Sequence, residues 1–593
     1  MATITRIFDL LEHSRKNFRK PDMVAAKQQG AWKLYSTDEF LKLTDELSRG
    51  LIALGVKKDD KIAIMSPNRP EWNIADFAIM QIGATQVPMY PTLSDGDIRY
   101  ILKDAEVKVA FASDALLAKK LENARLINES ELIIYTFEEV LEARSWKEVL
   151  ELGRANPETD LEYYRQQVSS EDLLTLIYTS GTTGTPKGVM LTHQNLVSNV
   201  VESSVMYPPG YKKALSFLPL SHIFERMVLY MYIYLGVSVY YAESMETIVA
   251  DIADVKPDGF TTVPRLLEKV YDKIVAKGSE LTGIKRKLFF WALDLGLKYE
   301  MDGKNGALYE LKLKIANKLI FSKWRAALGG NIRALVSGGA ALQPRLARVF
   351  WAAQMPVLEG YGLTETSPVI AVNGLAKGAA MFGTVGKPIK DVVVKIADDG
   401  EILCKGPNVM RGYYNNPAAT AEAIDSDGFF HTGDIGELIE GKYLRITDRK
   451  KEIFKTAGGK YVAPQVLENK FKESIFIEQV MVLGENERFP SALIVPSFAN
   501  LRNWCEKMDI PVGSNSETIL KKEVLTKIQE EVDLYNQEFG NWERVKKIAL
   551  LPAEWSIEGG ELTPKLSLKR KVIFDKNRNI IGEIYKNSEQ VEI

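Results

Sequence analysis

The stretch YTSGTTGTPKG occupies residues 178–188 and follows the apolar run LLTLIY at 173–178, which predicts a buried strand. Glycines let a backbone bend and approach a ligand closely, while hydroxyls, backbone N–H groups and the ammonium group of Lys187 donate hydrogen bonds. The stretch therefore predicts a loop that holds a polyanion, and phosphate is the candidate. It is not a Walker loop, which ends in Gly-Lys-Ser/Thr, because Pro186 precedes this lysine and Gly188 follows it.

On either side of this loop, short apolar runs alternate with longer amphipathic ones. KIAIM at 61–65 and QVPMY at 86–90 predict strands, and a helix beginning at Pro70 lies between them. Further strands are predicted at 107–111, 214–218, 237–241, 259–263 and 332–338. Strands that alternate with helices are typical of α/β proteins, so we expect doubly wound, mostly parallel sheets.

Two helical regions raise the question of membrane contact. The uncharged stretch Met227–Ala242 is shorter than the roughly 20 residues of a membrane span, and we interpret it as a buried helix followed by a buried strand. Residues 280–330 predict two or three helices rich in Lys, Leu and Ala. Helices that cover the sheet are the favoured interpretation of this second region, and contact with a membrane surface is the alternative.

The pattern changes after residue 400, where short strands are joined by tight turns, and a charged stretch begins at 447. We expect an N-terminal domain over 1–447, a hinge at 448–451, a mixed αβ C-terminal domain over 452–575 and a polar tail over 576–593.

Composition narrows the class of protein. The 593 residues carry 76 Lys and Arg against 78 Asp and Glu, a net charge of -2, so a basic nucleic-acid footprint is absent from the overall balance. Cys404 and Cys505 are too far apart in sequence to predict a disulfide framework or a paired-cysteine metal site. Two cysteines fit a reducing cytoplasm, and the charged N-terminal residues do not predict a signal peptide.

Eight motifs occur in one order along almost the whole chain: YTSGTTGTPKGVMLTH, FLPLSHIFER, LVSGGAAL, EGYGLTETSP, GTVGKP, HTGDIG, DRKKEIFKTAGGKYVAPQVLE and LTPKLSLKRK. This series resembles the adenylate-forming superfamily, which includes acyl-CoA synthetases, firefly-type luciferases and peptide-synthetase adenylation domains. The residues within these motifs and the helical insert at 280–330 are most similar to those of long-chain fatty acyl-CoA synthetases. The resemblance implies a large domain of doubly wound sheets with a small β-barrel-like subdomain, and a small, mobile α+β C-terminal domain.

The resemblance also implies a reaction. A long-chain fatty acid would attack the α-phosphate of ATP to form an acyl-adenylate, and the thiol of coenzyme A would then take the acyl group, giving acyl-CoA, AMP and pyrophosphate. Such phosphoryl chemistry depends on positioning and charge stabilisation. Fatty acid, ATP and coenzyme A are then the substrates and Mg²⁺ the metal, and no nucleic acid is expected as a partner. A cytoplasmic enzyme with peripheral membrane contact, and a homodimer, remain possible states.

The family's nucleotide site maps onto matching positions of this chain. The opening loop would hold the β- and γ-phosphates through Thr179, Ser180, Gly181, Thr182, Thr183, Gly184 and Lys187. The adenine and acyl pocket would lie against Gly338, Gly339, Ala340, Glu359, Gly360, Tyr361, Gly362 and Leu363. Asp434 would accept the ribose hydroxyls, Arg449 would clamp the ribose and phosphate side, and Thr364 would lie near the α-phosphate.

Two further residues acquire roles from the motifs. Glu365 would bind Mg²⁺ with help from Thr179, because a carboxylate and a hydroxyl suit a hard cation that keeps several waters. His222 would lie beside the acyl carboxylate and the path of the thiol, although it remains unproven as a base. For His193, just before a predicted helix, capping or packing is the favoured interpretation.

The C-terminal motifs imply a hinged second half-reaction. Lys451 matches the pivot of the hinge, and a few such residues absorb the rotation of the small domain. After that rotation, Lys455, Gly458 and Gly459 would face the site, and the glycines would let the pantetheine arm of coenzyme A pass. A plain hairpin turn would also explain these glycines.

One position departs from the family's pattern. Ser567 stands where the family carries a catalytic lysine, and Lys565 stands two residues earlier. In an extended segment, 565, 567 and 569 share one face, so we expect Lys565 to substitute, with Lys569 as the other candidate.

Two other functions remain open from the sequence. The chain could deliver its acyl-adenylate to a carrier-protein phosphopantetheine, or it could be a binding protein with weakened catalysis. Ser567 is the only support for the second of these, and the retention of Lys187, Glu365, Asp434 and Arg449 argues against it.

Overall fold

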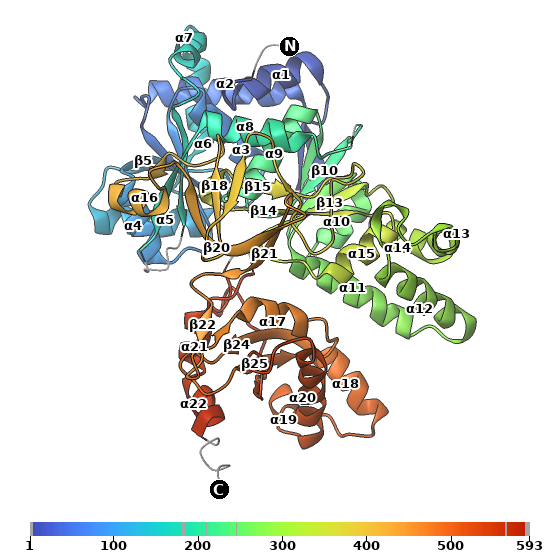
Figure 1. Ribbon diagram of the computed structural model, residues 1–593. Helices are drawn as coiled ribbons and strands as arrows, with labels where there is room; N and C mark the ends of the chain where they lie inside the picture. The colour runs from blue at the N-terminus through green and yellow to red at the C-terminus, as the bar shows by residue number, and fades with distance from the viewer. Residues whose placement is uncertain (1–3, 180–184, 209, 245, 564–565, 587–593) are drawn as a thin grey trace.

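The computed structural model describes residues 4–179, 185–208, 210–244, 246–563 and 566–586. A large N-terminal part contains two sheets and their helices, and the smaller C-terminal part follows β21 at one side of it (Figure 1). The predicted α/β class with a small second domain is confirmed.

The first sheet has parallel strands at its centre and antiparallel strands at both edges. β1, β11, β10, β12, β13 and β14 pair in parallel, while β2, β15 and β16 pair antiparallel. In sheet order the described strands are β16 (Lys387–Pro388), β15 (Val369–Val372), β14 (Val357–Gly362), β13 (Ala334–Ser337), β12 (Gly259–Thr262), β10 (Lys213–Ser216), β11 (Ser238–Tyr241), β1 (Val24–Gln28) and β2 (Ala31–Tyr35).

The second sheet is also parallel at its centre. Its strands run in the order β19 (Gly412–Tyr413), β9 (Lys187–Thr192), β8 (Leu173–Thr179), β4 (Thr85–Met89), β3 (Lys61–Met65), β5 (Val107–Ala112), β6 (Ile133–Thr136) and β7 (Arg144–Ser145). The predicted strand before the phosphate loop is β8, and β9 returns antiparallel to it, so the loop closes a hairpin. The predicted helix at Pro70 is α3 (Pro70–Met80).

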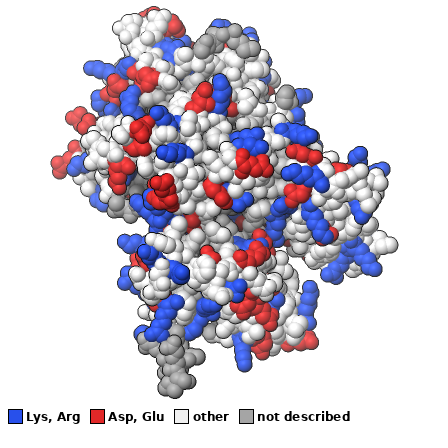
Figure 2. Space-filling view, in the orientation of Figure 1, with Lys and Arg blue, Asp and Glu red and all other residues white. Residues whose placement is uncertain are grey.

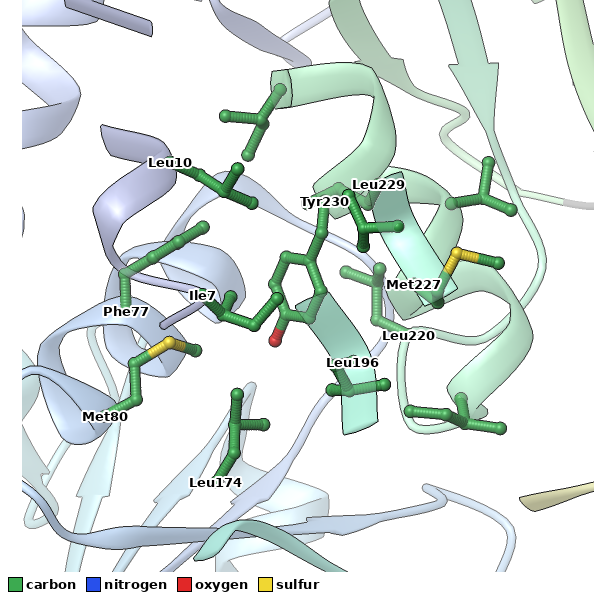
Figure 3. Packing of buried hydrophobic residues seen from close by; sticks show 14 of the residues in the cluster. Ile7, Leu10, Phe77, Met80, Leu174, Leu196, Leu220, Met227, Leu229 and Tyr230 are labelled. Carbon is green, nitrogen blue, oxygen red and sulfur yellow. The ribbon is translucent and has the colours of Figure 1, made fainter. Parts of the chain in front are cut away.

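Helices fill the space between the two sheets. α3 and α9 (Ile223–Leu235) are buried on nearly all sides, which agrees with the apolar character of their sequences. They share a core with α1 (Asp9–Asn17), α2 (Thr37–Ala53), α6 (Trp146–Ala155) and α8 (His193–Ser204). Figure 3 shows Tyr230 of α9 among Leu10, Phe77, Leu174 and Leu196 from four other elements. The uncharged stretch at 227–242 is thus a buried helix followed by the buried strand β11, as predicted.

Further helices cover the outer faces of the sheets. α4 (Asp95–Asp104) and α5 (Ala115–Asn128) pack on the second sheet. The first sheet is covered by α10 (Ile248–Val255), α11 (Pro264–Ser279), α12 (Gly283–Leu297), α13 (Ala307–Ala316), α14 (Ser322–Ala327) and α15 (Pro344–Ala352). α12 and α13 extend away from the body of the molecule (Figure 1). None of the helices within the described residues is both long and apolar enough to cross a membrane.

The small β subdomain is an antiparallel sheet of β17 (Val393–Ile396), β18 (Glu401–Lys405), β20 (Phe430–Ile439) and β21 (Tyr443–Arg449). Gly441 has a left-handed backbone (φ 67°) at the turn between β20 and β21, as its place in a tight hairpin requires. The last residue of β21 is Arg449, so this strand leads directly into the predicted hinge.

The C-terminal part has its own sheet of β24 (Ile477–Leu483), β25 (Ser491–Pro496) and β26 (Lys547–Leu550), with the hairpin β22 (Phe454–Lys455) and β23 (Tyr461–Val462) beside the hinge. One face of the sheet packs on α17 (Pro464–Phe471), α18 (Phe498–Lys507) and α20 (Lys522–Asn536). The other face packs on α21 (Arg570–Lys576) and α22 (Arg578–Lys586).

The expectation of a polar tail from residue 576 is wrong for most of that range. Residues 578–586 form α22, and Ile581 and Ile584 are buried against the sheet. The hydroxyl groups of Tyr585 and Ser491 are 2.6 Å apart. Apolar side chains at helical spacing supply enough burial to order a segment whose remaining residues are polar. Residues 587–593 lie outside the described residues.

Candidate active site

The motif segments meet because they follow neighbouring parallel strands. β10, β12, β13 and β14 lie side by side, and Thr262, Ser337 and Glu359 are register partners in the last three. The carboxyl ends of these strands therefore share one edge of the sheet, which is where open α/β sheets bind ligands. The segments after these four ends contain His222, residues 263–268, residues 338–342 and residues 363–365.

The expected adenine segments are in contact with each other. A Cβ on Gly338 would lie 3.7 Å from the backbone oxygen of Gly360 and 3.2 Å from the ring of Phe224. Gly339 has a left-handed backbone (φ 83°) and is exposed together with Ala340. Gly362 leaves no room for a side chain, since a Cβ would fall 1.7 Å from the oxygen of Pro368. The glycines of both motifs thus let two backbones and a ligand approach closely.

Glu359 contributes to this segment without a surface charge. Its side chain is buried, and burial raises the pKa of the carboxyl to about 8, partly offset by a hydrogen bond with the backbone of Leu342. The carboxyl therefore links β14 to the segment after β13. Its neighbour Tyr361 is the residue whose hydroxyl reaches the expected ribose site.

The carboxylate of Asp434 accepts hydrogen bonds from two side chains of the predicted site. The hydroxyl of Tyr361 donates to Oδ2 at 2.7 Å, and Nε of Arg449 donates to Oδ1 at 3.0 Å. Asp434 is 5% exposed, whereas the side chain of Arg449 is 53% exposed. Burial raises the pKa of Asp434, and the charge of Arg449 and the Tyr361 hydrogen bond oppose that rise. Strand pairing of Asp434 with Arg449 fixes this contact in β20 and β21.

The hairpin of β8 and β9 lies close to Glu365, the predicted metal ligand. Nζ of Lys187 is 5.0 Å from the ring centre of Tyr413, and the Tyr413 hydroxyl donates to Oε1 of Glu365 at 2.9 Å. The amide of Tyr414 donates to the oxygen of Gly188 at 2.7 Å, which attaches this tyrosine segment to β9. Thr179 pairs with Lys187 at the base of the hairpin. The structure therefore brings Thr179, Lys187 and Glu365 into one region.

Some predicted site residues are not described. Ser180, Gly181, Thr182, Thr183 and Gly184 of the phosphate loop lie outside the described residues, as does Lys565. Their predicted roles therefore stay predictions.

The residues near Glu365 fit a magnesium ion that keeps most of its ligands from water and phosphate. Glu365 is half-buried, and Thr179 supplies a hydroxyl near the hairpin. In the part of the chain that the structure describes, no cluster of three or more His, Cys, Asp or Glu side chains could hold a metal ion. One carboxylate plus substrate phosphates is how Mg²⁺ is commonly bound, whereas an all-protein cage is not.

His222 caps α9. Its Nδ1 accepts a hydrogen bond from the amide of Phe224 at 3.1 Å, so the neutral ring carries its proton on Nε2. Nδ1 is thereby occupied by the helix cap. His193 instead has a structural role, as predicted: it is buried, accepts from the amide of Ile7 at 3.2 Å, and burial lowers its pKa to about 3.

The two residues after Phe224 tie α9 to both sheets. Glu225 accepts hydrogen bonds from Ser216 of β10 at 2.6 Å and from Thr261 of β12. Arg226 donates to Thr175 of β8 at 2.7 Å and pairs with Asp76 of α3. All of these side chains are buried. The helix that begins at His222 is thus fixed between the two sheets at its first turn.

Thr364 begins a short 3₁₀ turn over Thr364–Thr366, between the adenine segment and Glu365. Thr364 is buried, and Leu363 before it is half-buried. The backbone oxygen of Glu365 accepts from the amide of Met410 at 2.8 Å. This turn therefore places the two motif residues on adjacent positions of a fixed backbone.

The residues of the predicted hinge and those after it are held by side-chain contacts. Asp448 accepts from the amides of Arg449 at 2.6 Å and Gln465 at 3.1 Å, and burial raises its pKa to about 7. Beyond the hinge, Glu452 accepts from Arg570 at 2.7 Å, and Arg570 also pairs with Glu468 at 2.6 Å. These contacts bind the first residues after the pivot to the C-terminal part.

The predicted hinge and C-terminal site residues that the structure describes are exposed. They are Lys451, Lys455, Gly458, Gly459 and Lys569. Lys455 lies 4.7 Å from the ring centre of Tyr461 across the hairpin, and Gly459 has a left-handed backbone (φ 74°) at its turn. The turn of the hairpin is a sufficient structural reason for these glycines, and both are exposed to solvent.

The expectation of an extended segment around Ser567 is wrong. Leu562 and Leu568 form an antiparallel bridge, and the amide of Thr563 donates to the oxygen of Ser567 at 2.9 Å. Leu566 has a left-handed backbone (φ 63°), which an extended strand does not contain. The described residues 566–569 therefore do not continue as an extended strand.

The two parts of the chain touch through the loop that joins α17 to β24 and through the start of β24. Glu478 pairs with Arg265 at the start of α11, and the oxygen of Lys472 accepts from Gln343 at 3.2 Å. Arg345 of α15 and Tyr271 of α11 line the same crevice. The observed orientation is therefore held by contacts beside α11 and α15.

Sequence reasoning missed three contributors. Tyr413, which links Lys187 to Glu365, lies 48 residues from Glu365 in sequence and in no motif that we recognised. Glu225 and Arg570 do lie within quoted motifs, where a charged residue beside apolar ones was the available signal.

Comparison with known proteins agrees with this site. The family of AMP-binding enzymes matches residues 14–414, and the C-terminal domain of AMP-binding enzymes matches residues 452–589. A long-chain-fatty-acid–CoA ligase of Mycobacterium tuberculosis is 35% identical over 590 residues, covering 97% of this chain and 96% of that protein. The human long-chain-fatty-acid–CoA ligase 1 is 34% identical over 606 residues, covering 96% of this chain and 83% of that protein.

Solved structures share the fold. The adenylation domain of a carboxylate reductase from Mycobacterium chelonae has a TM-score of 0.76 at 21% identity, covering 99% of this chain and 92% of that one. An anthranilate CoA ligase in complex with anthranoyl-AMP has a TM-score of 0.72 at 17% identity, covering 96% and 97%. At these identities the likeness concerns the fold alone.

Proposed function

The chain belongs to the family of AMP-binding enzymes, and we propose that it is an AMP-forming long-chain-fatty-acid–CoA ligase. It activates a long-chain fatty acid with ATP and transfers the acyl group to coenzyme A. The observation that carries this conclusion is the buried carboxylate of Asp434, which Tyr361 and Arg449 hold beside the two glycine-rich segments. A buried carboxylate with this support is suited to accept hydrogen bonds from the hydroxyl groups of a ribose.

The nucleotide would be held along the edge of the first sheet. Asp434 and Arg449 take the ribose, and the backbones at 338–340 and 359–363 take the adenine. Lys187 and the hairpin at 179–188 take the outer phosphates, with Thr364 near the α-phosphate. This assignment is supported by the way Tyr413 connects the hairpin to Glu365 and by the strand pairing of Asp434 with Arg449.

The acid would bind where the ends of β10, β12 and β13 meet, against residues 258–268, 336–342 and 358–364. One carboxylate oxygen attacks the α-phosphorus of ATP, the bond to the bridging oxygen breaks, and pyrophosphate leaves with that electron pair. The thiolate of coenzyme A then attacks the acyl carbon and AMP leaves. His222, which caps the first turn of α9, would lie beside this carboxylate.

Glu365 and Thr179 are the proposed protein ligands of Mg²⁺. When bound, this ion would neutralise charge on the ATP phosphates. The Tyr413 hydroxyl orients Glu365 through one oxygen, and the other carboxylate oxygen remains to meet a cation.

Residues 1–447 would form the nucleotide-binding domain, 448–451 the hinge and 452 onward a C-terminal domain that rotates between the half-reactions. Lys451 would be the pivot, and Lys455, Gly458 and Gly459 would line the path of coenzyme A. Lys565 or Lys569 would supply positive charge during adenylation. The separate cores of the C-terminal part and its anchoring through Arg570 support a unit that moves as one body.

We also propose a cellular location and an oligomeric state for the enzyme. Buried, unpaired Cys404 and Cys505 support a cytoplasmic location. A long-chain acid resides in membranes, so peripheral membrane contact is proposed as well, and a homodimer is the proposed assembly. Sedimentation of the pure protein measures the mass of that assembly directly.

One assay tests the proposal. The chain is incubated with ATP, Mg²⁺ and acids of increasing chain length, with and without coenzyme A, and pyrophosphate, AMP and thioester are followed together. We expect long-chain acids to give AMP and acyl-CoA only when coenzyme A is present. Pyrophosphate without thioester would instead indicate a carrier-protein acceptor, and ATP binding without turnover would indicate a binding protein.

A further inference from the structure

The outer side of α13 carries a stripe of exposed apolar side chains. Leu308, Leu311 and Ile315 are 68%, 58% and 46% exposed, and Leu319 in the following turn is 43% exposed. Spacings of three and four residues place these side chains on one face of the helix. Leu313 and Ala316 point the other way and are buried in the core, so the helix is apolar on two opposite sides.

α12, which packs against α13, also carries exposed apolar side chains. Ile284 and Leu288 are one helical turn apart and exposed, while Phe289 and Leu293 on the other side are buried. α12 packs against α13, and both helices project from the body (Figure 1). We call the exposed apolar residues Ile284, Leu288, Leu308, Leu311, Ile315 and Leu319 the outer face. Single exposed leucines are ordinary on protein surfaces, but an aligned set on two adjacent helices is not.

Positive charge surrounds the outer face. Residues 283–327 contain ten Lys and Arg and four Asp and Glu, in a chain whose net charge is -2. Two of the four acids are paired within the protein, Asp294 with Lys298 and Glu300 with Arg348. Figure 2 shows Lys and Arg side chains gathered over the projecting helices, with uncharged surface between them. The exposed basic residues are Lys285, Arg286, Lys287, Lys298, Lys304, Lys312, Lys314, Lys318 and Lys323.

We propose that the outer face docks on the surface of an anionic lipid membrane. An apolar stripe bordered by lysines is the pattern of interfacial helices, whose apolar side enters the acyl boundary while the lysines reach phosphate head groups. Attraction of many flexible lysines to a diffuse negative surface adds to this binding. Charge complementarity selects the lipid over a second copy of the chain, because two such basic faces would repel each other.

The docked helices connect the membrane to the acid site. α12 packs on α11 and α15, and these helices begin directly after the carboxyl ends of β12 and the segment at 338–342. A membrane under the outer face would therefore lie on the side of the fold that is built around the acid-binding segments. This purpose rests on the proposed ligase function, whereas the docking itself does not require turnover.

The test is cosedimentation of the full chain with vesicles of neutral phosphatidylcholine alone or mixed with anionic phosphatidylglycerol. We expect binding to the mixed vesicles that weakens as salt is added and nearly disappears with the neutral ones. The variant Leu308→Gln/Leu311→Gln, and separately Lys312→Gln/Lys318→Gln, should each weaken binding by more than about tenfold. The matched control is Leu126→Gln/Ile127→Gln, which changes two exposed apolar residues of α5 and should bind normally.

Circular dichroism and turnover of a water-soluble acid separate docking from folding and from catalysis. Outer-face variants should keep both and lose only the stimulation that vesicles give with a membrane-embedded long-chain acid. If the chain turns over no acid, the ligase proposal fails while vesicle binding still decides the docking. Absent binding to anionic vesicles, equal binding by all variants, or a change in oligomer mass in place of vesicle binding would each overturn the docking inference.

Discussion

The proposed nucleotide site of the N-terminal part and the motif residues of the C-terminal part differ in how far their side chains are buried and hydrogen-bonded. Asp434 is buried between Tyr361 and Arg449, and Glu365 is held by Tyr413. By contrast, Lys455, Gly459 and Lys569 are exposed on the surface of the C-terminal part. The groups proposed to bind the nucleotide are thus held in place by side-chain contacts, whereas the groups proposed for each half-reaction lie exposed beyond the proposed hinge.

The largest expected effect comes from removing a fixed group. Asp434→Ala should lower the rate of pyrophosphate release on the order of 100- to 1000-fold, because a preorganised charged partner of the nucleotide is lost. Stopped-flow measurement of pyrophosphate gives this number. Glu437→Ala is the matched control, since Glu437 is an exposed acid on the same strand β20. Equal losses in both variants would mean that Asp434 acts only through the stability of the strand.

A smaller but selective effect is expected in the moving part. Lys565→Ala should slow adenylate formation about 100-fold and thioester formation much less, because positive charge at the α-phosphate is lost in one orientation only. Single-turnover assays with ATP and acid, and with preformed acyl-adenylate and coenzyme A, measure the two steps. Lys569→Ala is the comparison, since Lys569 is the other candidate beside the turn at Ser567. Equal slowing of both steps, or of neither, would refute the assignment to Lys565.

The proposed hinge lies between the two regions, and its carboxyl group Asp448 should make stability depend on pH. Burial raises the pKa of Asp448 from 3.8 to about 7, so the folded protein binds a proton in this window that the unfolded chain has released. The free energy of unfolding should therefore fall as pH rises through the window, by at most about 1.4 kcal/mol per unit. Urea titrations of the native protein and of Asp448→Asn measure this slope.

The asparagine variant should lose this part of the slope because it cannot ionise. Asp399→Asn is the control with the opposite sign, since Lys450 and backbone hydrogen bonds lower the pKa of Asp399. An unchanged slope in Asp448→Asn would show that other buried carboxyls, such as Glu225 and Glu359, dominate the pH response.

The fixed region was more predictable than the moving one. The strand at 61–65 and the helix at Pro70 follow from apolar periodicity, and the motif residues fall at the ends of parallel strands as the α/β pattern requires. Periodicity could not identify Tyr413 as the hydrogen-bond partner of Glu365. The two residues are 48 positions apart in sequence, and only the tertiary fold brings them together.

In the C-terminal part, the sequence signal was weaker or was read incorrectly. Leu566 has a left-handed backbone, a conformation that is uncommon for leucine and that the sequence therefore did not predict. The last helix had a usable signal in Ile581 and Ile584, which share one face, but its polar composition favoured a tail. Local patterns thus predict elements well and predict long-range polar contacts poorly.

The smallest expected effect concerns the contact that holds the two regions in the observed orientation. The Arg265–Glu478 pair lies at the rim of the crevice between them, and a pair of this kind contributes about 1 kcal/mol or less. Arg265→Ala should therefore broaden the distribution of domain orientations, measured by fluorescence energy transfer between one label on each domain. Both half-reactions should stay within about fivefold of the native rates.

Reversing the charges separates this docking contact from simple damage to α11. Arg265→Glu alone places two acids together and should shift the orientations further than Arg265→Ala does. Combined with Glu478→Arg, it should restore the native distribution because the pair is rebuilt with opposite signs. Failure of the combined variant to restore the distribution would assign the orientation to the backbone contacts of Lys472 with Gln343 and Arg345 instead. In that case, hydrogen bonds to the backbone oxygen of Lys472 would hold the two regions together, and reversing the charges of the Arg265–Glu478 pair would not change their orientation.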